Sequence, residues 1–138
     1  MSEQNSKNWQ AQIEKAHLAY KNAYAPYSHF FVGAAAMTAS GTIVSGCNVE
    51  NASYGLTICA ERNCIAQAVV AGEQTFESIV IYTEQEKLTP PCGACRQVIA
   101  EFFEPSAQVM ATNHLGQQQI WTVAQLLPDA FTPKDLTP

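Results

Sequence analysis

Two short stretches, Cys59-Ala60-Glu61-Arg62 and Pro91-Cys92-Gly93-Ala94-Cys95-Arg96, set the organisation of the chain. Each has the pattern of a helix beginning, and together they offer three cysteines and one carboxylate. Three thiolates could hold a zinc ion and leave its fourth position open. An open position is typical of catalytic zinc sites, whereas structural sites usually fill all four positions with protein ligands. Glu61 would then lie where it can move protons to and from a water molecule at the metal.

The segments outside the two motifs alternate between helical and strand patterns. Apolar residues recur at three- and four-residue steps over residues 9–23 and predict a first helix, which ends because Pro26 cannot continue it. The other predicted elements are strands at 30–38 and 42–47, a loop at 48–58, a helix at 60–71, a strand at 76–83, a loop at 84–91, a helix at 92–103, strands at 107–113 and 117–123, and a tail at 124–138. Short turns predict hairpins between the first two and the last two strands. This order predicts an α/β fold with a mixed five-stranded sheet and helices packed on its faces.

The composition is that of a globular protein. The chain has 138 residues, 47% hydrophobic and 14% charged, enough for one domain with a buried core. No apolar run approaches the roughly 20 residues that cross a bilayer, and the polar N-terminus is unlike a signal peptide, so we expect a soluble, cytoplasmic protein without a membrane partner. The net charge is -5 and the seven Lys and Arg residues are not clustered, so we expect no nucleic-acid polymer as a partner.

The cysteine count favours metal binding over disulfides. Five cysteines is an odd number, and we expect reduced thiols in a chain without a secretory signal. A structural zinc site with Cys64 as the fourth ligand is an alternative. However, a helix from Ala60 onward would point Cys64 well away from Cys59, so we expect Cys64 to be a buried apolar cysteine, like Cys47 on its strand.

Two arginines are placed where they can balance thiolate charge. Three thiolates around a dication leave a net charge of about -1, and such a centre would acidify water poorly unless charge is drawn from the sulfurs. The only arginines of the chain, Arg62 and Arg96, each stand at the end of a motif. We expect their guanidinium groups to donate to the thiolates, with ordinary surface arginines in a first helical turn as the alternative.

The residues around Glu61 indicate a catalytic role for it. Alone it would say little, because acidic residues are common in the first turn of a helix. Zinc deaminases, however, carry a non-ligand Glu followed by Pro-Cys-x-x-Cys, and here Cys59 takes the position often held by His. The chain resembles the short, homotetrameric, zinc-dependent type of the cytidine and deoxycytidylate deaminase family over nearly its whole length. The segments that carry this resemblance are Tyr24-Ala25-Pro26-Tyr27-Ser28, Phe30, Gly46-Cys47-Asn48-Val49-Glu50-Asn51-Ala52, Leu126-Leu127-Pro128 and the two motifs.

The resemblance implies a fold and a reaction. It implies a single three-layer α/β/α domain spanning residues 1–138, a homotetramer, and one zinc ion per chain held by Cys59, Cys92 and Cys95. The implied reaction, part of pyrimidine salvage, is hydrolytic deamination of cytidine and deoxycytidine to uridine and deoxyuridine plus ammonia. Glu61 would take a proton from the attacking water, protonate ring N3 and later protonate the departing amine.

The resemblance also implies contacts to the nucleoside. Asn48 and Glu50 would hydrogen-bond the ribose, mainly its 3′-hydroxyl, which predicts weak discrimination between ribo- and deoxyribonucleosides. Phe30 would stack on the pyrimidine, the backbone of Ala60 would contact the base, and Phe131 would come from a neighbouring subunit. From the pattern alone, Asn48 and Glu50 fit a solvated turn better than a sugar site, and Phe30 fits a core position on a strand equally well.

Other functions fit the motifs less well. A deaminase of a cytosine-containing antibiotic, such as the blasticidin S type, shares the zinc motifs, but the loop Asn48-Val49-Glu50-Asn51 is more typical of a nucleoside site. A zinc-stabilised binding module is the alternative from another class, and it would need Cys64 as a ligand. A deaminase of RNA or DNA is disfavoured by the acidic charge balance.

Overall fold

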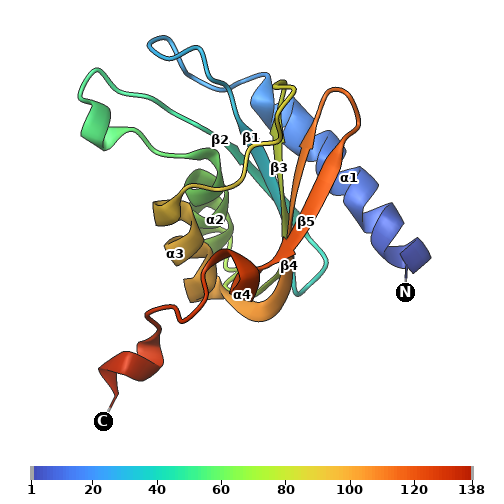
Figure 1. The fold of residues 1–138 in the computed structure, drawn as a ribbon, viewed down its shortest axis with the longest axis vertical. Helices are drawn as coiled ribbons and strands as arrows, with labels where there is room; N and C mark the ends of the chain where they lie inside the picture. The colour runs from blue at the N-terminus through green and yellow to red at the C-terminus, as the bar shows by residue number, and fades with distance from the viewer. Residues whose placement is uncertain (1, 138) are drawn as a thin grey trace.

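The computed structural model describes residues 2–137, with side chains from Trp9 onward. Figure 1 shows helices on both sides of one twisted sheet and a C-terminal segment that runs away from it. The helices are α1 (Ser2–Tyr20), α2 (Ala60–Val70), α3 (Gly93–Phe102), α4 (Val123–Leu126) and the 3₁₀ turns η1 (Tyr54–Leu56) and η2 (Pro133–Leu136). The strands are β1 (Gly33–Thr38), β2 (Ile43–Cys47), β3 (Phe76–Thr83), β4 (Phe103–Asn113) and β5 (Gln118–Thr122).

The five strands form one mixed sheet, as predicted. Their order is β2-β1-β3-β4-β5. β1 pairs antiparallel with both β2 and β3, β3 pairs parallel with β4, and β4 pairs antiparallel with β5. Both predicted hairpins are therefore confirmed, and so is the α/β fold.

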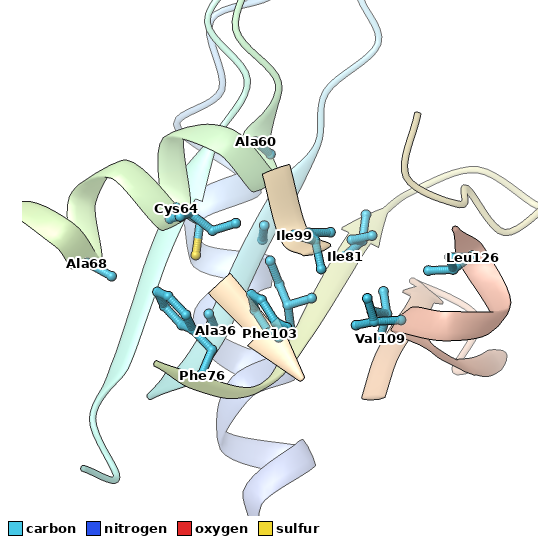
Figure 2. Close-up of a cluster of buried hydrophobic side chains, with 14 residues drawn as sticks. Ala36, Ala60, Cys64, Ala68, Phe76, Ile81, Ile99, Phe103, Val109 and Leu126 are labelled. Atoms are coloured by element: carbon cyan, nitrogen blue, oxygen red, sulfur yellow. The ribbon is translucent and has the colours of Figure 1, made fainter. Parts of the chain in front are cut away.

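Two cores fill the space between the sheet and its helices. Because successive strand residues point to opposite faces, Val80 of β3 lies under α1, whereas Ile79 and Ile81 lie under the helices on the other face. Figure 2 shows this second core, in which side chains from α2, α3 and α4 meet the sheet. The chain thus has the three α/β/α layers that the resemblance implied.

The topology brings the beginnings of α2 and α3 to one edge of the sheet. β2 and β3 run in the same direction, because both are antiparallel to β1, which lies between them. The loops that leave their ends therefore start at the same edge, and each loop leads into a helix (Figure 1). This edge is where open α/β sheets usually bind their ligands. α2 can approach β2 closely because position 46 is glycine, where a Cβ atom would lie 2.5 Å from the backbone nitrogen of Cys64.

Some boundaries differ from the predicted ones. The first helix ends at Tyr20, and β1 begins only at Gly33. Phe30 therefore precedes the strand, because the Asn48 side chain binds the backbone of Phe30 and Val32 at the place where strand pairing was expected. No element was predicted in the tail at 124–138, whereas the structure has most of α4 and all of η2 there. Across residues 2–137, no helix combines the length and the apolarity that crossing a membrane requires.

Candidate active site

The three motif cysteines meet where α2 and α3 begin. Cys59 is the N-cap residue of α2, Cys92 is the N-cap residue of α3, and Cys95 lies in the first turn of α3. Their Sγ atoms all lie within 4.8 Å of one another, and those of Cys59 and Cys92 are 3.9 Å apart. The topology of the sheet thus joins two motifs that are far apart in the sequence.

The cysteine cluster fits a zinc ion. Zinc–sulfur bonds of about 2.3 Å at tetrahedral angles place two ligand sulfurs about 3.8 Å apart, close to the spacing of Cys59 and Cys92. Helix N-termini offer partial positive charge and unpaired backbone N–H groups to thiolates. Hydrogen bonds from Cys95 and then Arg62 lower the pKa of Cys59 to about 5, whereas the Cys59 thiolate raises that of Cys95. One member of the trio therefore already favours the ionised form that zinc requires, and three ligands leave the fourth position open.

Cys64 does not belong to this cluster. It is buried in the core between α2 and the sheet, where its thiol donates to the carbonyl oxygen of Val44 at 3.2 Å (Figure 2). Burial raises the pKa of Cys64 to about 12, so this thiol stays protonated. The alternative of a four-cysteine structural site therefore does not fit the structure.

The two arginines differ. Arg62 behaves as expected, because its Nη2 donates to Sγ of Cys59 at 3.4 Å. Arg96 instead donates from Nε to the carbonyl oxygen of Pro91 at 2.7 Å and from Nη1 to that of Leu126 at 3.1 Å. The prediction that Arg96 donates to a thiolate is therefore wrong. Its guanidinium group extends to α4 instead and connects the Cys92 motif to that helix.

A cavity of about 270 Å³ opens beside the cysteines. Phe30, Asn48, Glu50, Ala60 and Glu61, all predicted from the sequence, line it together with Cys59 and Cys92. Three further polar residues line the cavity and were not predicted from the sequence: Ser28, Thr57 and Thr89. Ser28 could have been predicted, because it ends a segment that carries the family resemblance.

Glu61 is buried in the wall of this cavity. It lies in the first turn of α2, and only 5% of its surface is exposed. Burial raises its pKa to about 7, and the negative charge of Cys59 adds to the effect, while its own backbone N–H opposes it. A carboxyl group with this pKa can both accept and donate a proton near neutral pH.

Asn48 and Glu50 bind the segment that carries Phe30. Asn48 accepts from the backbone N–H of Val32 at 2.9 Å and donates to the carbonyl oxygen of Phe30 at 2.8 Å. Glu50 accepts from the backbone N–H groups of Tyr27 at 3.0 Å and Ser28 at 3.1 Å, and from the Ser28 hydroxyl. The two expected sugar ligands therefore also shape the wall of the cavity.

Phe131 lies apart from the other predicted site residues. It is 59% exposed and does not line the cavity of its own chain. Its carbonyl oxygen accepts a hydrogen bond from Nε2 of Gln97 at 2.9 Å, which anchors the start of the C-terminal segment to α3. Within one chain, the structure does not bring Phe131 together with Glu61.

Comparisons with known proteins agree with this geometry. The family model described as the cytidine and deoxycytidylate deaminase zinc-binding region matches residues 6–112. A curated cytidine deaminase of Sporosarcina psychrophila is 46% identical over 125 residues, which cover 91% of this chain and 92% of the relative. The crystal structure of cytidine deaminase from Burkholderia pseudomallei matches with a TM-score of 0.85 and 48% identity, covering 88% of this chain and 98% of that one. The corresponding structure from Mycobacterium tuberculosis matches with a TM-score of 0.78 and 36% identity, covering 89% and 96%.

Proposed function

Because the chain belongs to the cytidine and deoxycytidylate deaminase family, we propose that it hydrolyses the C4 amine of cytidine and deoxycytidine. Water and the nucleoside would give uridine or deoxyuridine and ammonia. The observation that carries this proposal is the buried carboxyl group of Glu61, which has a pKa of about 7 and shares a cavity with Cys59 and Cys92. That combination suits a reaction in which one group must take up and release several protons.

Glu61 is the proton carrier in this proposal. A zinc ion held by Cys59, Cys92 and Cys95 would supply a Lewis acid that acidifies water at the open fourth position. Glu61 accepts one proton from the attacking water and delivers it to ring N3 of the pyrimidine. It then accepts the proton of the new hydroxyl group on C4 and delivers it to the departing amine, so that the two protons it releases are the two it has taken up. Burial raises the pKa of Glu61 above that of an exposed carboxyl group, which favours its role as both proton acceptor and proton donor.

The remaining cavity residues bind the nucleoside. Phe30 stacks on the pyrimidine, the backbone of Ala60 contacts the base, and Asn48 and Glu50 receive the sugar. Their position in the cavity lining supports these roles. A cavity of about 270 Å³ suits a small molecule better than a polymer, and the net charge of -5 disfavours a phosphate backbone.

We also propose the setting in which the enzyme works. A single catalytic domain would span residues 1–138, supported by the one sheet that contains all five strands. The five free thiols support a reducing cytoplasmic location. The proposed reaction turns cytidine into uridine, which suits a role in pyrimidine salvage. We propose no membrane partner and, because the net charge is -5, no nucleic-acid partner. The exposure of Phe131 supports a homotetramer in which this residue reaches a neighbouring site.

Zinc content and turnover test the proposal together. Purified protein should hold about one zinc per chain by the count of three thiolate ligands, and it should convert cytidine but not blasticidin S. Glu61→Gln should keep the zinc and lose turnover by at least about 100-fold. Glu77→Gln is the matched control, because Glu77 is an exposed carboxylate on β3 outside the cavity. A wild-type protein that holds zinc and leaves cytidine untouched would refute the assignment.

A further inference from the structure

Ser28 connects two cavity residues that the proposed function assigns to the nucleoside. Its hydroxyl donates to Oε2 of Glu50, and the same oxygen atom of Ser28 accepts from the backbone N–H of Phe30 at 3.0 Å. Ser28, Phe30 and Glu50 all line the cavity. One side chain therefore holds both the carboxylate expected at the sugar and the aromatic residue expected at the base.

The hydrogen bonds of Glu50 leave little free capacity. A carboxylate has about four acceptor positions on its two oxygens. Oε1 already accepts from the backbone N–H groups of Tyr27 at 3.0 Å and Ser28 at 3.1 Å, and Oε2 accepts from the Ser28 hydroxyl. About one position remains, on Oε2. The hydrogen bond from Ser28 also lowers the pKa of Glu50, so this group stays ionised and can only accept.

The backbone around Ser28 is held in an uncommon conformation. His29 has a φ of 58°, in the left-handed region that residues other than glycine seldom adopt. Its N–H donates to the carbonyl oxygen of Ala25 at 3.0 Å, which closes a tight turn just before Phe30. Backbone strain of this kind persists where the surrounding contacts enforce it, and it clusters at functional sites. Glu50 supplies such contacts by binding Tyr27 and Ser28 within the turn.

We propose that Ser28 is a positioning residue that sets sugar specificity, by holding Glu50 so that one acceptor position stays open to the cavity. This inference rests on the proposed function. A single open position accepts one sugar hydroxyl, which Glu50 would take from the 3′ carbon. Cytidine and deoxycytidine both carry this hydroxyl and are treated alike, whereas 3′-deoxycytidine lacks it and leaves the carboxylate with an unused acceptor.

Steady-state kinetics on cytidine and 3′-deoxycytidine test the inference. The wild type should favour cytidine by about tenfold or more in kcat/KM, as expected for one hydrogen bond to a charged group. Ser28→Ala should raise KM for cytidine about tenfold, keep kcat within about twofold, and leave both constants for 3′-deoxycytidine unchanged. Ser28→Thr keeps the hydroxyl and should remain within about threefold of the wild type. In a Glu50→Gln background, Ser28→Ala should have no further effect on cytidine, because the two residues act as one unit.

The outcomes distinguish a failure of the Ser28 inference from a failure of the proposed function. If Ser28→Ala still penalises loss of the 3′-hydroxyl as strongly as the wild type does, Ser28 does not act through Glu50, while the deaminase assignment stands. If Ser28→Ala loses zinc or unfolds, Ser28 supports the fold rather than the sugar site, and the inference falls. If the wild type does not deaminate cytidine, both fall together. Ser106→Ala, an exposed serine on β4 outside the cavity, is the matched control and should equal the wild type with both nucleosides.

Discussion

Arg62 and Arg96 stand at the ends of similar motifs, yet their guanidinium groups bind different partners. Arg62 donates to the Cys59 thiol and draws negative charge from the cluster. We predict that Arg62→Ala lowers kcat about tenfold, because a more electron-rich thiolate set leaves the metal a weaker Lewis acid. Cytidine kinetics measure this loss, and zinc titration with a competing chelator checks that the metal stays bound. Arg62→Lys should recover only part of the loss, because a lysine keeps the charge but not the planar donor geometry.

Arg96→Ala is the counterpart to Arg62→Ala. This substitution removes the two hydrogen bonds from the guanidinium group to the carbonyl oxygens of Pro91 and Leu126. It should therefore lower the free energy of unfolding by about 1–3 kcal/mol. Urea unfolding of the zinc-loaded protein measures this change. If Arg62→Ala and Arg96→Ala lost the same stability and the same activity, the assignment of Arg62 to the metal site and of Arg96 to the fold would be wrong.

Cys64 tests whether the metal site has three ligands or four. We predict that Cys64→Ala keeps about one zinc per chain and lowers the free energy of unfolding by about 1 kcal/mol, because it only leaves a small space in the core. Cys92→Ala is the matched comparison and should lose the metal. Metal analysis of both purified variants decides the matter, and a zinc-free Cys64→Ala protein would restore the four-cysteine hypothesis.

The site residues that could be predicted from the sequence are those whose chemistry depends on local spacing. The cysteines and Glu61 lie in two short motifs at helix beginnings, so their spacing alone places them correctly. The role of Ser28 could not be predicted, because its contact to Glu50 spans 22 residues and depends on the left-handed turn at His29. The contact of Arg96 with Leu126 was missed because α4 was missed.

At the scale of elements, Asn113 links the end of β4 to the loop that leads to Cys92. Its Nδ2 donates to the carbonyl oxygen of Gln85 at 2.9 Å and to Oε1 of Gln117 at 2.8 Å. Its Oδ1 accepts from the backbone N–H groups of Leu115 and Gln117, both at 3.1 Å. Only 4% of Asn113 is exposed, so these bonds form in a nearly dry environment.

We predict that Asn113→Asp destabilises the protein by about 2–3 kcal/mol. The substitution keeps size and acceptors but removes the donor, and it places a buried carboxylate against the carbonyl oxygen of Gln85. The loosened loop should also release zinc faster to a chelator, because Cys92 follows it directly. Urea unfolding and timed zinc release check both effects. His114→Ala, at the neighbouring exposed turn, is the control, and an aspartate variant as stable as the wild type would contradict the role of Asn113.

Periodic elements were predicted well, and irregular ones were not. β3 has the predicted bounds because its apolar run is short and buried. β4 begins earlier than predicted, since Phe103 pairs with Phe76 across an irregular stretch that includes Pro105, a residue that suggests a break in a strand. α4 is only one turn long and shows no period, but Thr122 and Gln125 form a capping box whose spacing was visible in the sequence.

At the scale of the whole molecule, a single chain does not bring all of the predicted site residues into its cavity. The C-terminal segment extends away from the sheet (Figure 1), with Phe131 outside the cavity of its own chain. Three tyrosines near Glu50 are also exposed: Tyr24 by 54%, Tyr27 by 46% and Tyr54 by 75%. The rings of Tyr27 and Tyr54 lie 6.1 Å apart. Exposed apolar groups gathered in this way mark surfaces that contact another protein. A second copy of the chain is the partner that the proposed tetramer requires.

We predict that Phe131 acts in the site of a neighbouring chain. Phe131→Ala should form tetramers by sedimentation and raise KM for cytidine about fivefold, the loss expected for one aromatic contact. Leu136→Ala, at a still more exposed position of the tail, is the control and should keep the wild-type KM. Mixed tetramers of Phe131→Ala and Glu61→Gln chains give the sharper test, because an intact Glu61 and an intact Phe131 can then meet only across an interface. Part of the activity should return with the wild-type KM. Mixtures that show only the raised KM, or a protein that sediments as a monomer, would place the function of Phe131 within its own chain.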